Sequence, residues 1–415
     1  MSLTDTIKNK FIKKIASDFV LSAVALVVFN GVVQFLVYPQ FDKKLGADGY
    51  GDVLFYISVI SIMASTFGTA ANYSRMVRST TGADRNADYN RFLLIAAGIC
   101  IPVVIGIGIY TNLSVFYILG FFLAMILTIL RFYADCEFKL NINYRGFLLY
   151  YLVAALGYVI GILIFRFTSN WTIPLIMGEL FALLFVLFFG KIFRSPVLKK
   201  SEFYADSMKS MWILTGANII PAIVLNADRI LLKSMYGGEA ATQYYIACLV
   251  GKTISFVTTP LNGVMIGYLA KWNGRFTKKM WNLSSLALFV VAILATAACF
   301  VGSWVYVRLI YPDYLDEIKK YFLVANCGQI FYFIGNSLMV ILLRFAEEKY
   351  QTLINTLYAV IFVVAVPILT KFFGIYGFAY SLLGVNFIKF CLVIAVGLIK
   401  IGKNESVQLK SEDEI

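Results

Sequence analysis

Four ionisable residues lie within or at the edge of long apolar stretches, where a charge needs an explanation. They are Lys252, Lys389, Glu179 and Asp228. A charged side chain at the centre of a bilayer costs about 2.5–3.5 kcal/mol, so such a residue is expected to have a partner or a function. An ammonium group can neutralise phosphate, and a carboxylate can bind and release a proton or a sodium ion. The candidate chemistry is therefore phosphate and ion binding inside a membrane.

Each of these residues also has a structural interpretation. Lys252 and Lys389 are predicted to bind an anionic substrate, with a structural ion pair as the alternative, for Lys252 with Glu179 or Asp228. Glu179 and Asp228 are the candidates for coupling transport to a proton or sodium ion. The alternative is that each carboxylate is paired with a group on a neighbouring helix. Arg229 follows Asp228. This pair is either a gate or an interfacial pair that reaches water.

Two arginines and three tyrosines complete the predicted substrate site. Arg75 and Arg78 end a predicted span and are candidates to guide an anionic head group, although anchoring of a cytoplasmic loop explains them without such a function and is the favoured interpretation. Tyr56, Tyr73 and Tyr244 can stack on sugar rings or simply face lipid and protein.

A further charged cluster falls between two predicted spans. Its members are Arg131, Asp135, Glu137, Lys139 and Arg145. We interpret it as a solvated connection.

The composition limits which chemistry the chain can perform. The 415 residues include no histidine, which excludes Ser-His-Asp catalysis and histidine metal sites. Six scattered cysteines form no C-x-x-C pair. No catalytic residue, metal or cofactor is predicted beyond a proton or sodium counter-ion, and the chain is not expected to be an enzyme.

The elements that position these residues are predicted membrane helices. Hydrophobic residues make up 60% of the chain and charged residues 14%, with mean hydropathy +0.80. Such a chain cannot cover itself with polar side chains, and its length suits an all-α polytopic protein. Twelve spans are predicted at about 18–38, 52–73, 91–110, 113–132, 146–166, 172–192, 210–228, 243–269, 283–306, 321–343, 352–370 and 375–399.

The predicted domains follow from this division. They are an amphipathic interfacial helix at 1–16, a first six-helix bundle at 17–195, a cytoplasmic linker at 196–209, a second bundle at 210–400 and a polar, disordered tail at 401–415.

The distribution of basic residues predicts the topology. Of the 36 Lys and Arg residues, 25 fall in the termini and even-numbered connections, 9 in the odd-numbered connections and 2 within spans. The positive-inside rule therefore places both termini in the cytoplasm. It also explains the net charge of +13 without nucleic acid as a partner.

Three short segments resemble a known family. The first is residues 39–56 (PQFDKKLGADGYGDVLFY), with a Leu-Gly turn and an acidic residue; the second is 226–232 (NADRILL), followed by 244–247 (YYIA); the third is 374–379 (GIYGFA). Together they resemble Wzx-like polysaccharide flippases of the multidrug/oligosaccharidyl-lipid/polysaccharide exporter superfamily.

The resemblance implies two pseudo-symmetric six-helix bundles around a central cavity lined mainly by helices 1, 2, 7 and 8. Because Lys252 falls on predicted helix 8, the substrate role is favoured there more than at Lys389. The implied activity is alternating-access translocation of undecaprenyl-diphosphate-linked oligosaccharide to the outer leaflet of a bacterial cytoplasmic membrane. This activity serves O-antigen or capsule biosynthesis.

The implied partners are the lipid-linked oligosaccharide, membrane lipids, a polysaccharide polymerase and glycosyltransferases. Two alternatives stay open. One is a multidrug or metabolite cation antiporter of the same superfamily, which would prefer carboxylates in its cavity. The other is an integral-membrane polysaccharide polymerase, although the sequence has no large external loop to hold its active site.

Overall fold

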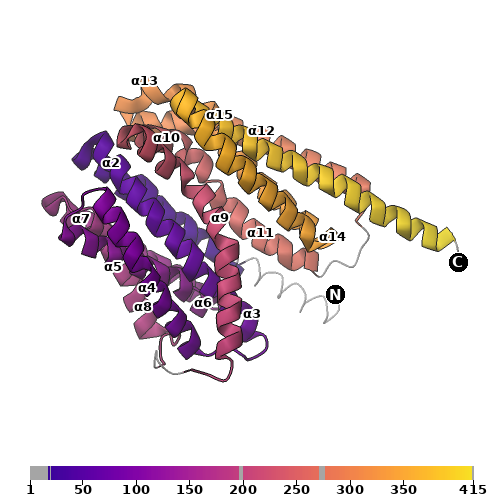
Figure 1. Cartoon of the computed structure of the whole chain (residues 1–415), viewed down its shortest axis with the longest axis horizontal. Coiled ribbons are helices and arrows are strands. Elements are labelled where there is room, and N and C mark those ends of the chain that lie inside the picture. Colours follow the sequence, from indigo (N-terminus) through magenta and orange to yellow (C-terminus); the bar gives the residue numbers. More distant parts are fainter. Residues whose placement is uncertain (1–16, 19, 196–199, 271–275, 414–415) are drawn as a thin grey trace. The chain divides into compact units, whose positions relative to one another are not determined.

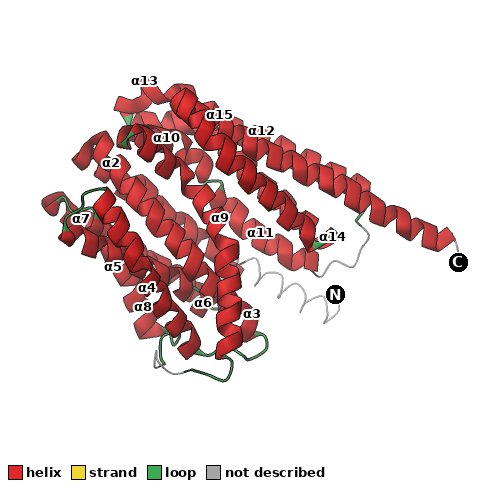
Figure 2. Cartoon of the chain, viewed as in Figure 1, coloured by secondary structure: helices red, strands yellow, loops and turns green. Residues whose placement is uncertain are grey.

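The computed structural model describes residues 17–18, 20–195, 200–270 and 276–413. Within these ranges all regular structure is helical, with short loops between the helices and no strand (Figure 2). A helix satisfies its backbone hydrogen bonds internally, as a segment in lipid must. The predicted amphipathic helix at 1–16 lies outside the described residues.

The helices follow one another closely along the chain. They are η1 (Val32–Val37), α2 (Tyr38–Met63), η2 (Ala64–Gly68), α3 (Thr69–Ser79), α4 (Asn86–Tyr110), α5 (Val115–Ala134), α6 (Cys136–Leu140), α7 (Tyr144–Thr168), α8 (Thr172–Phe189), α9 (Tyr204–Tyr236), α10 (Gly238–Lys252), α11 (Ser255–Ala270), α12 (Lys278–Ile310), η3 (Pro312–Tyr314), α13 (Leu315–Ile318), η4 (Lys319–Tyr321), α14 (Phe322–Phe345) and α15 (Glu348–Asp413).

Nine helical stretches of the described chain are long and apolar enough to cross a membrane. Two of them, Val20–Ser79 with 60 residues and Lys349–Ile401 with 53, exceed the roughly 20 residues that one crossing needs. Each is interrupted by a glycine with positive φ, Gly46 at 73° and Gly374 at 60°. Splitting both adds two spans. The broken helix α10–α11 adds a twelfth, so the described helices supply the twelve predicted crossings.

The two interrupting glycines have a clear physical reason. A residue with a Cβ atom in the left-handed region is less stable by about 1–2 kcal/mol, whereas glycine adopts it freely. Gly46 belongs to the Leu-Gly turn and Gly374 to the glycine-paired turn singled out in the sequence. These segments are therefore the turns that end one crossing and begin the next.

The chain divides into two compact units, Met1–Ile230 and Leu231–Ile415. The division falls inside α9, because the first part of this helix packs on the first unit. The Trp212 ring lies 5.3 Å from Phe92 and 6.3 Å from Phe67, and the hydroxyls of Ser74 and Ser210 are hydrogen-bonded at 2.9 Å. The predicted domain boundaries stay predictions.

In the first unit α7 packs closely on α8, and α8 packs on α5 (Figure 1). Gly157 and Gly161 are four residues apart on α7, a spacing typical of close helix contacts in membranes. A Cβ atom would lie 2.6 Å from the Met177 carbonyl oxygen at Gly157 and 2.5 Å from Pro174 Cα at Gly161. Glycine therefore sets the distance between α7 and α8.

In the second unit α14 packs against α10, α11, α12 and α15. Its core joins Trp281 of α12, Phe331 and Leu338 of α14, and Phe390 and Val393 of α15. The polar tail predicted as a disordered end instead continues α15 as helix to Asp413, because it has no glycine or proline beyond Gly402 to end the helix.

Candidate functional site

The first unit contains an ion pair enclosed by helices. Arg131 Nε on α5 donates to Glu179 Oε2 on α8 at 2.6 Å, and the Tyr158 hydroxyl on α7 donates to Glu179 Oε1 at 2.8 Å. Glu179 is only 1% exposed. The guanidinium also lies 4.8 Å from the ring centres of Phe29 and Phe132. Both carboxylate oxygens are therefore engaged.

A glycine makes room for this arrangement. Gly178 precedes Glu179 on α8, and a Cβ atom there would lie 2.0 Å from the Tyr158 ring. The absence of a side chain at 178 lets the tyrosine ring pack on α8 and bring its hydroxyl to Glu179.

A second buried carboxylate lies at the end of α5. Asp135 accepts hydrogen bonds from Asn72, from Lys139 Nζ at 2.9 Å and from the Tyr151 hydroxyl at 3.2 Å. The neighbouring Tyr150 hydroxyl donates to the Arg131 carbonyl oxygen at 3.3 Å. The two ion pairs thus lie close together on α5 and α6, where side chains of α3, α7 and α8 contact them.

These ion pairs correct the interpretation of residues 131–145 as a solvated connection. Asp135 is buried and the Arg131 side chain is only 11% exposed, because α5 and α6 continue the helix to residue 140, beyond the predicted end near 132. The spacing of Arg131, Asp135 and Lys139 at intervals of four residues places them on one helix face, and this signal was available in the sequence.

In the second unit Lys389 of α15 is enclosed by neutral groups. Its Nζ donates to Asn336 Oδ1 at 2.7 Å and lies 4.6 Å and 5.1 Å from the ring centres of Tyr358 and Tyr332. The lysine is 4% exposed. The Tyr358 hydroxyl donates in turn to Asn386 Oδ1 at 2.8 Å. Within the described part of the chain Lys389 forms no ion pair, so aromatic faces and an amide replace a counter-ion.

Lys252 lies at a helix break. The predicted continuous helix at 243–269 is wrong, because α10 ends at Lys252 and α11 begins at Ser255. Asn326 of α14 stabilises the break: its Oδ1 accepts from the Gly251 backbone N at 2.6 Å. Lys252 Nζ lies 5.6 Å from the ring centre of Tyr245. Sequence reasoning missed Asn326, which lies 75 positions from Gly251.

Asp228 and Arg229 lie side by side on α9. Arg229 Nε is 3.8 Å from Asp228 Oδ1, and its guanidinium donates to Asn226 Oδ1 at 2.9 Å. Asp228 and Asn226 are buried. This placement is compatible with both predicted roles, the gate and the interfacial pair.

Arg75 is held in a closed network at the end of α3. Its guanidinium donates to the Tyr133 hydroxyl and to Asn86 Oδ1, each at 2.5 Å, and lies 3.5 Å from Asp84. Arg78, one turn further, is half-buried. A role for Arg75 as a guide for an anionic head group would require this network to open.

The three tyrosines differ in exposure. Tyr56 stacks on Trp171 with ring centres 4.8 Å apart, and Tyr244 packs edge-on against Phe378 at 4.9 Å. Both are buried, whereas Tyr73 is half exposed. In this conformation, therefore, only Tyr73 presents a ring to its surroundings.

The charged residues form separate groups within each unit. Glu179 and Asp228 belong to the first unit, and Lys252 and Lys389 to the second. Among the described residues no three cysteine or carboxylate side chains are placed to hold a metal ion. Chemically, the arrangement offers carboxylates paired with arginines in one unit and a buried ammonium in the other.

Comparison with known proteins shows the fold. No protein-family model and no curated protein sequence matches the chain. The inward-facing structure of a multidrug resistance MATE family transporter of the MOP superfamily is similar, with 10% identity and a TM-score of 0.65 over 92% of this chain and 95% of that one. The outward-facing structure of such a transporter gives 12% identity and 0.64 over 94% and 96%.

A Vibrio cholerae MATE transporter in its bent form is also similar, with 12% identity and a TM-score of 0.61 over 97% of this chain and 99% of that one. These similarities confirm the predicted fold class, an all-α protein with twelve transmembrane helices in two six-helix bundles. The chain is a multi-pass membrane protein, and its structural neighbours are transporters.

Proposed function

We propose that the chain is a transporter that exports an organic cation or an amphipathic metabolite by alternating access, in exchange for a proton or a sodium ion. The observation that carries the proposal is similarity over more than nine-tenths of the chain to both inward-facing and outward-facing structures of multidrug transporters. These neighbours favour the cation antiporter over the polysaccharide flippase indicated by the sequence segments.

The buried carboxylates supply the chemistry that such an exchange needs. Glu179 is held by Arg131, and Asp228 lies beside Arg229. Binding a proton at either carboxylate weakens its ion pair and frees the arginine to move. Protonation of the carboxylate is thereby linked to the conformation of the transporter. The assignment of coupling to Glu179 or Asp228 stays part of the proposal.

A lipid-linked oligosaccharide is the second candidate substrate, favoured by one specific observation. Lys389 is buried among neutral groups, with its Nζ bonded to Asn336 Oδ1. A buried ammonium that forms no ion pair with a carboxylate of the described chain suits a diphosphate better than a cation. The predicted partners in polysaccharide synthesis belong to this second candidate.

Purified protein in liposomes distinguishes the two substrates. We expect ethidium to move against its gradient when a pH or sodium gradient is imposed, and a fluorescent undecaprenyl-diphosphate oligosaccharide to stay in its leaflet. Movement of the lipid without movement of ethidium would replace the first proposal by the second. Movement of neither would contradict both.

The coupling residues are tested separately. E179Q and D228N proteins are compared with wild type while the pH and sodium gradients are varied one at a time. We expect at least one variant to lose its response to one gradient. A wild-type response in both would mean that the ion binds elsewhere.

The proposed location is a bacterial cytoplasmic membrane with both termini inside. A protease site fused after Ile415 should be cut only after cells are permeabilised. Cleavage in intact cells would contradict the proposed topology.

A further inference from the structure

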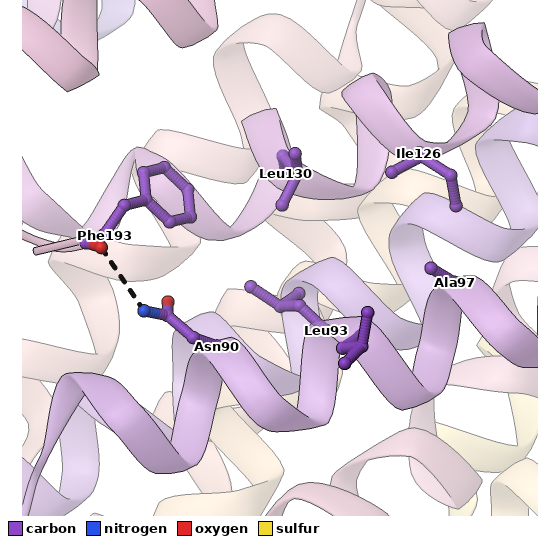
Figure 3. A pocket seen from close by; sticks show the side chains of 7 residues that line it. Asn90, Leu93, Ala97, Ile126, Leu130 and Phe193 are labelled. Carbon is purple, nitrogen blue, oxygen red and sulfur yellow. Dashed lines mark hydrogen bonds between the residues drawn. The ribbon is translucent and has the colours of Figure 1, made fainter. Parts of the chain in front are cut away.

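A groove lies on the first unit between α4 and α5, at the end where α4 begins and α5 finishes. Its volume is about 260 Å³. Figure 3 shows the side chains that line it. Its walls are formed mainly by Leu93 and Ala97 of α4 and by Ile126 and Leu130 of α5, while Asn90 and Phe193 close one end. The groove is apolar along its length and polar at that end, as a site for an acyl chain would be.

The polar end has an unsatisfied acceptor. Asn90 is 7% exposed, and its Nδ2 donates to the carbonyl oxygens of Phe193 and Ser195, each at 3.4 Å. Its Oδ1 is buried and has no hydrogen-bond partner among the described residues. A buried acceptor without a donor costs about 1–3 kcal/mol. A ligand that brings a hydroxyl to this point would remove the cost.

Three basic residues are close in the sequence to the residues that line this end of the groove. Arg91 follows Asn90 and lies one turn before Leu94, which also lines the groove. Its guanidinium lies 5.4 Å from the ring centre of Tyr204. Arg194 and Lys191, on either side of Phe193, are exposed. The charge at this end therefore suits an anion.

We propose that the groove binds an anionic phospholipid whose head group carries a hydroxyl, such as phosphatidylglycerol. One acyl chain fills the apolar groove, the phosphate lies between Arg91 and Arg194, and the head-group hydroxyl donates to Asn90 Oδ1. The site requires only that the protein is in a membrane, so it is independent of the proposed transport function. It faces the leaflet next to the basic ends of α4 and α5.

Native mass spectrometry of the full-length protein tests the site, with phosphatidylglycerol and phosphatidylcholine of matched acyl chains as probes. We expect phosphatidylglycerol to be retained about tenfold better than phosphatidylcholine. A97W fills the groove and should remove this preference, whereas I105W places the same side chain on an exposed part of α4 outside the groove and should keep it. R194Q changes only an exposed side chain and should lower phosphatidylglycerol retention about fivefold without affecting phosphatidylcholine.

Several results would overturn the proposal. Equal retention of the two lipids by wild type would remove the head-group specificity. Unchanged retention of phosphatidylglycerol by R194Q would also remove the head-group specificity. This result would overturn the proposal even if A97W fails to fold. If A97W shifts the protein between monomer and dimer and leaves lipid retention intact, the groove is a contact between two copies of the chain instead.

Discussion

Arg131 Nε and Glu179 Oε2 lie 2.6 Å apart inside the first unit, with the carboxylate 1% exposed. The pair joins α5 to α8, and Tyr158 adds α7 through its bond to the second carboxylate oxygen. Removing one member of a buried pair is costly, typically by about 3–5 kcal/mol, because the other charge remains in a low dielectric. Stability and any coupling role therefore depend on the same two side chains.

The two single variants of this pair should differ. E179Q leaves a guanidinium that cannot lose its proton, whereas R131M leaves a carboxyl that can take one up. We expect E179Q to lower the melting temperature in detergent at every pH, and R131M to regain stability as the pH falls. The double variant R131M/E179L should be more stable than either single one. If both single variants are as stable as wild type, the ion pair contributes nothing to the stability of the protein.

The contact between α7 and α8 depends on glycine. G161L places a side chain where a Cβ atom alone would lie 2.5 Å from Pro174 Cα, so we expect a loss of about 1–3 kcal/mol in the free energy of unfolding. G98L is the control, because nothing lies within 4 Å of a Cβ atom there. Equal melting temperatures of the two variants would contradict the close approach of α7 and α8 at Gly161.

The break in α15 depends on backbone conformation. Gly374 has φ of 60°, so G374A should lower the free energy of unfolding by about 1–2 kcal/mol. Gly384 has open space around its Cβ position and helical φ, so G384A should be neutral or stabilising by up to about 1 kcal/mol. Thermal unfolding of both proteins checks this, and a stable G374A would mean that α15 is one continuous helix.

The buried charge of Lys389 should lower the free energy of unfolding. K389M keeps the length of the side chain and removes a buried charge, so we expect the free energy of unfolding to rise despite the lost bond to Asn336. K371M, on an exposed lysine of the same helix, should change little. A lower melting temperature for K389M alone would show that the contacts of the ammonium with Asn336, Tyr332 and Tyr358 outweigh the cost of burying its charge.

The sequence was sufficient to predict the membrane-spanning helices, because the thickness of the bilayer fixes the length of each apolar crossing. A crossing needs about 20 apolar residues, and glycines such as Gly46 and Gly374 end the crossings at turns. Helix ends were less predictable: α5 and α6 together reach residue 140, and for this reason the Arg131 side chain is largely enclosed. A charged residue near a predicted end carries no local sign of the carboxylate 48 positions away that pairs with it.

The break beside Lys252 was missed for a similar reason. Residues 243–269 are apolar enough for a continuous helix, and the cause of the break is a side chain on another helix, Asn326, which takes the Gly251 backbone N–H. Tertiary hydrogen bonds of this kind override local propensity. Lys389 was predicted to lie within a span, but its enclosure by Tyr332 and Tyr358 depends on packing between α14 and α15.

Alternation between two faces is the central claim, and pulsed electron paramagnetic resonance tests it most directly. Spin labels at Ser114 and Asp313 lie in connections predicted to be external, and labels at Thr81 and Lys349 in connections predicted to be cytoplasmic, in a protein whose six cysteines are replaced by alanine. When pH or sodium changes, or ethidium is added, we predict that one distance lengthens while the other shortens. Two distances that stay fixed or change in the same direction under every condition would contradict the account.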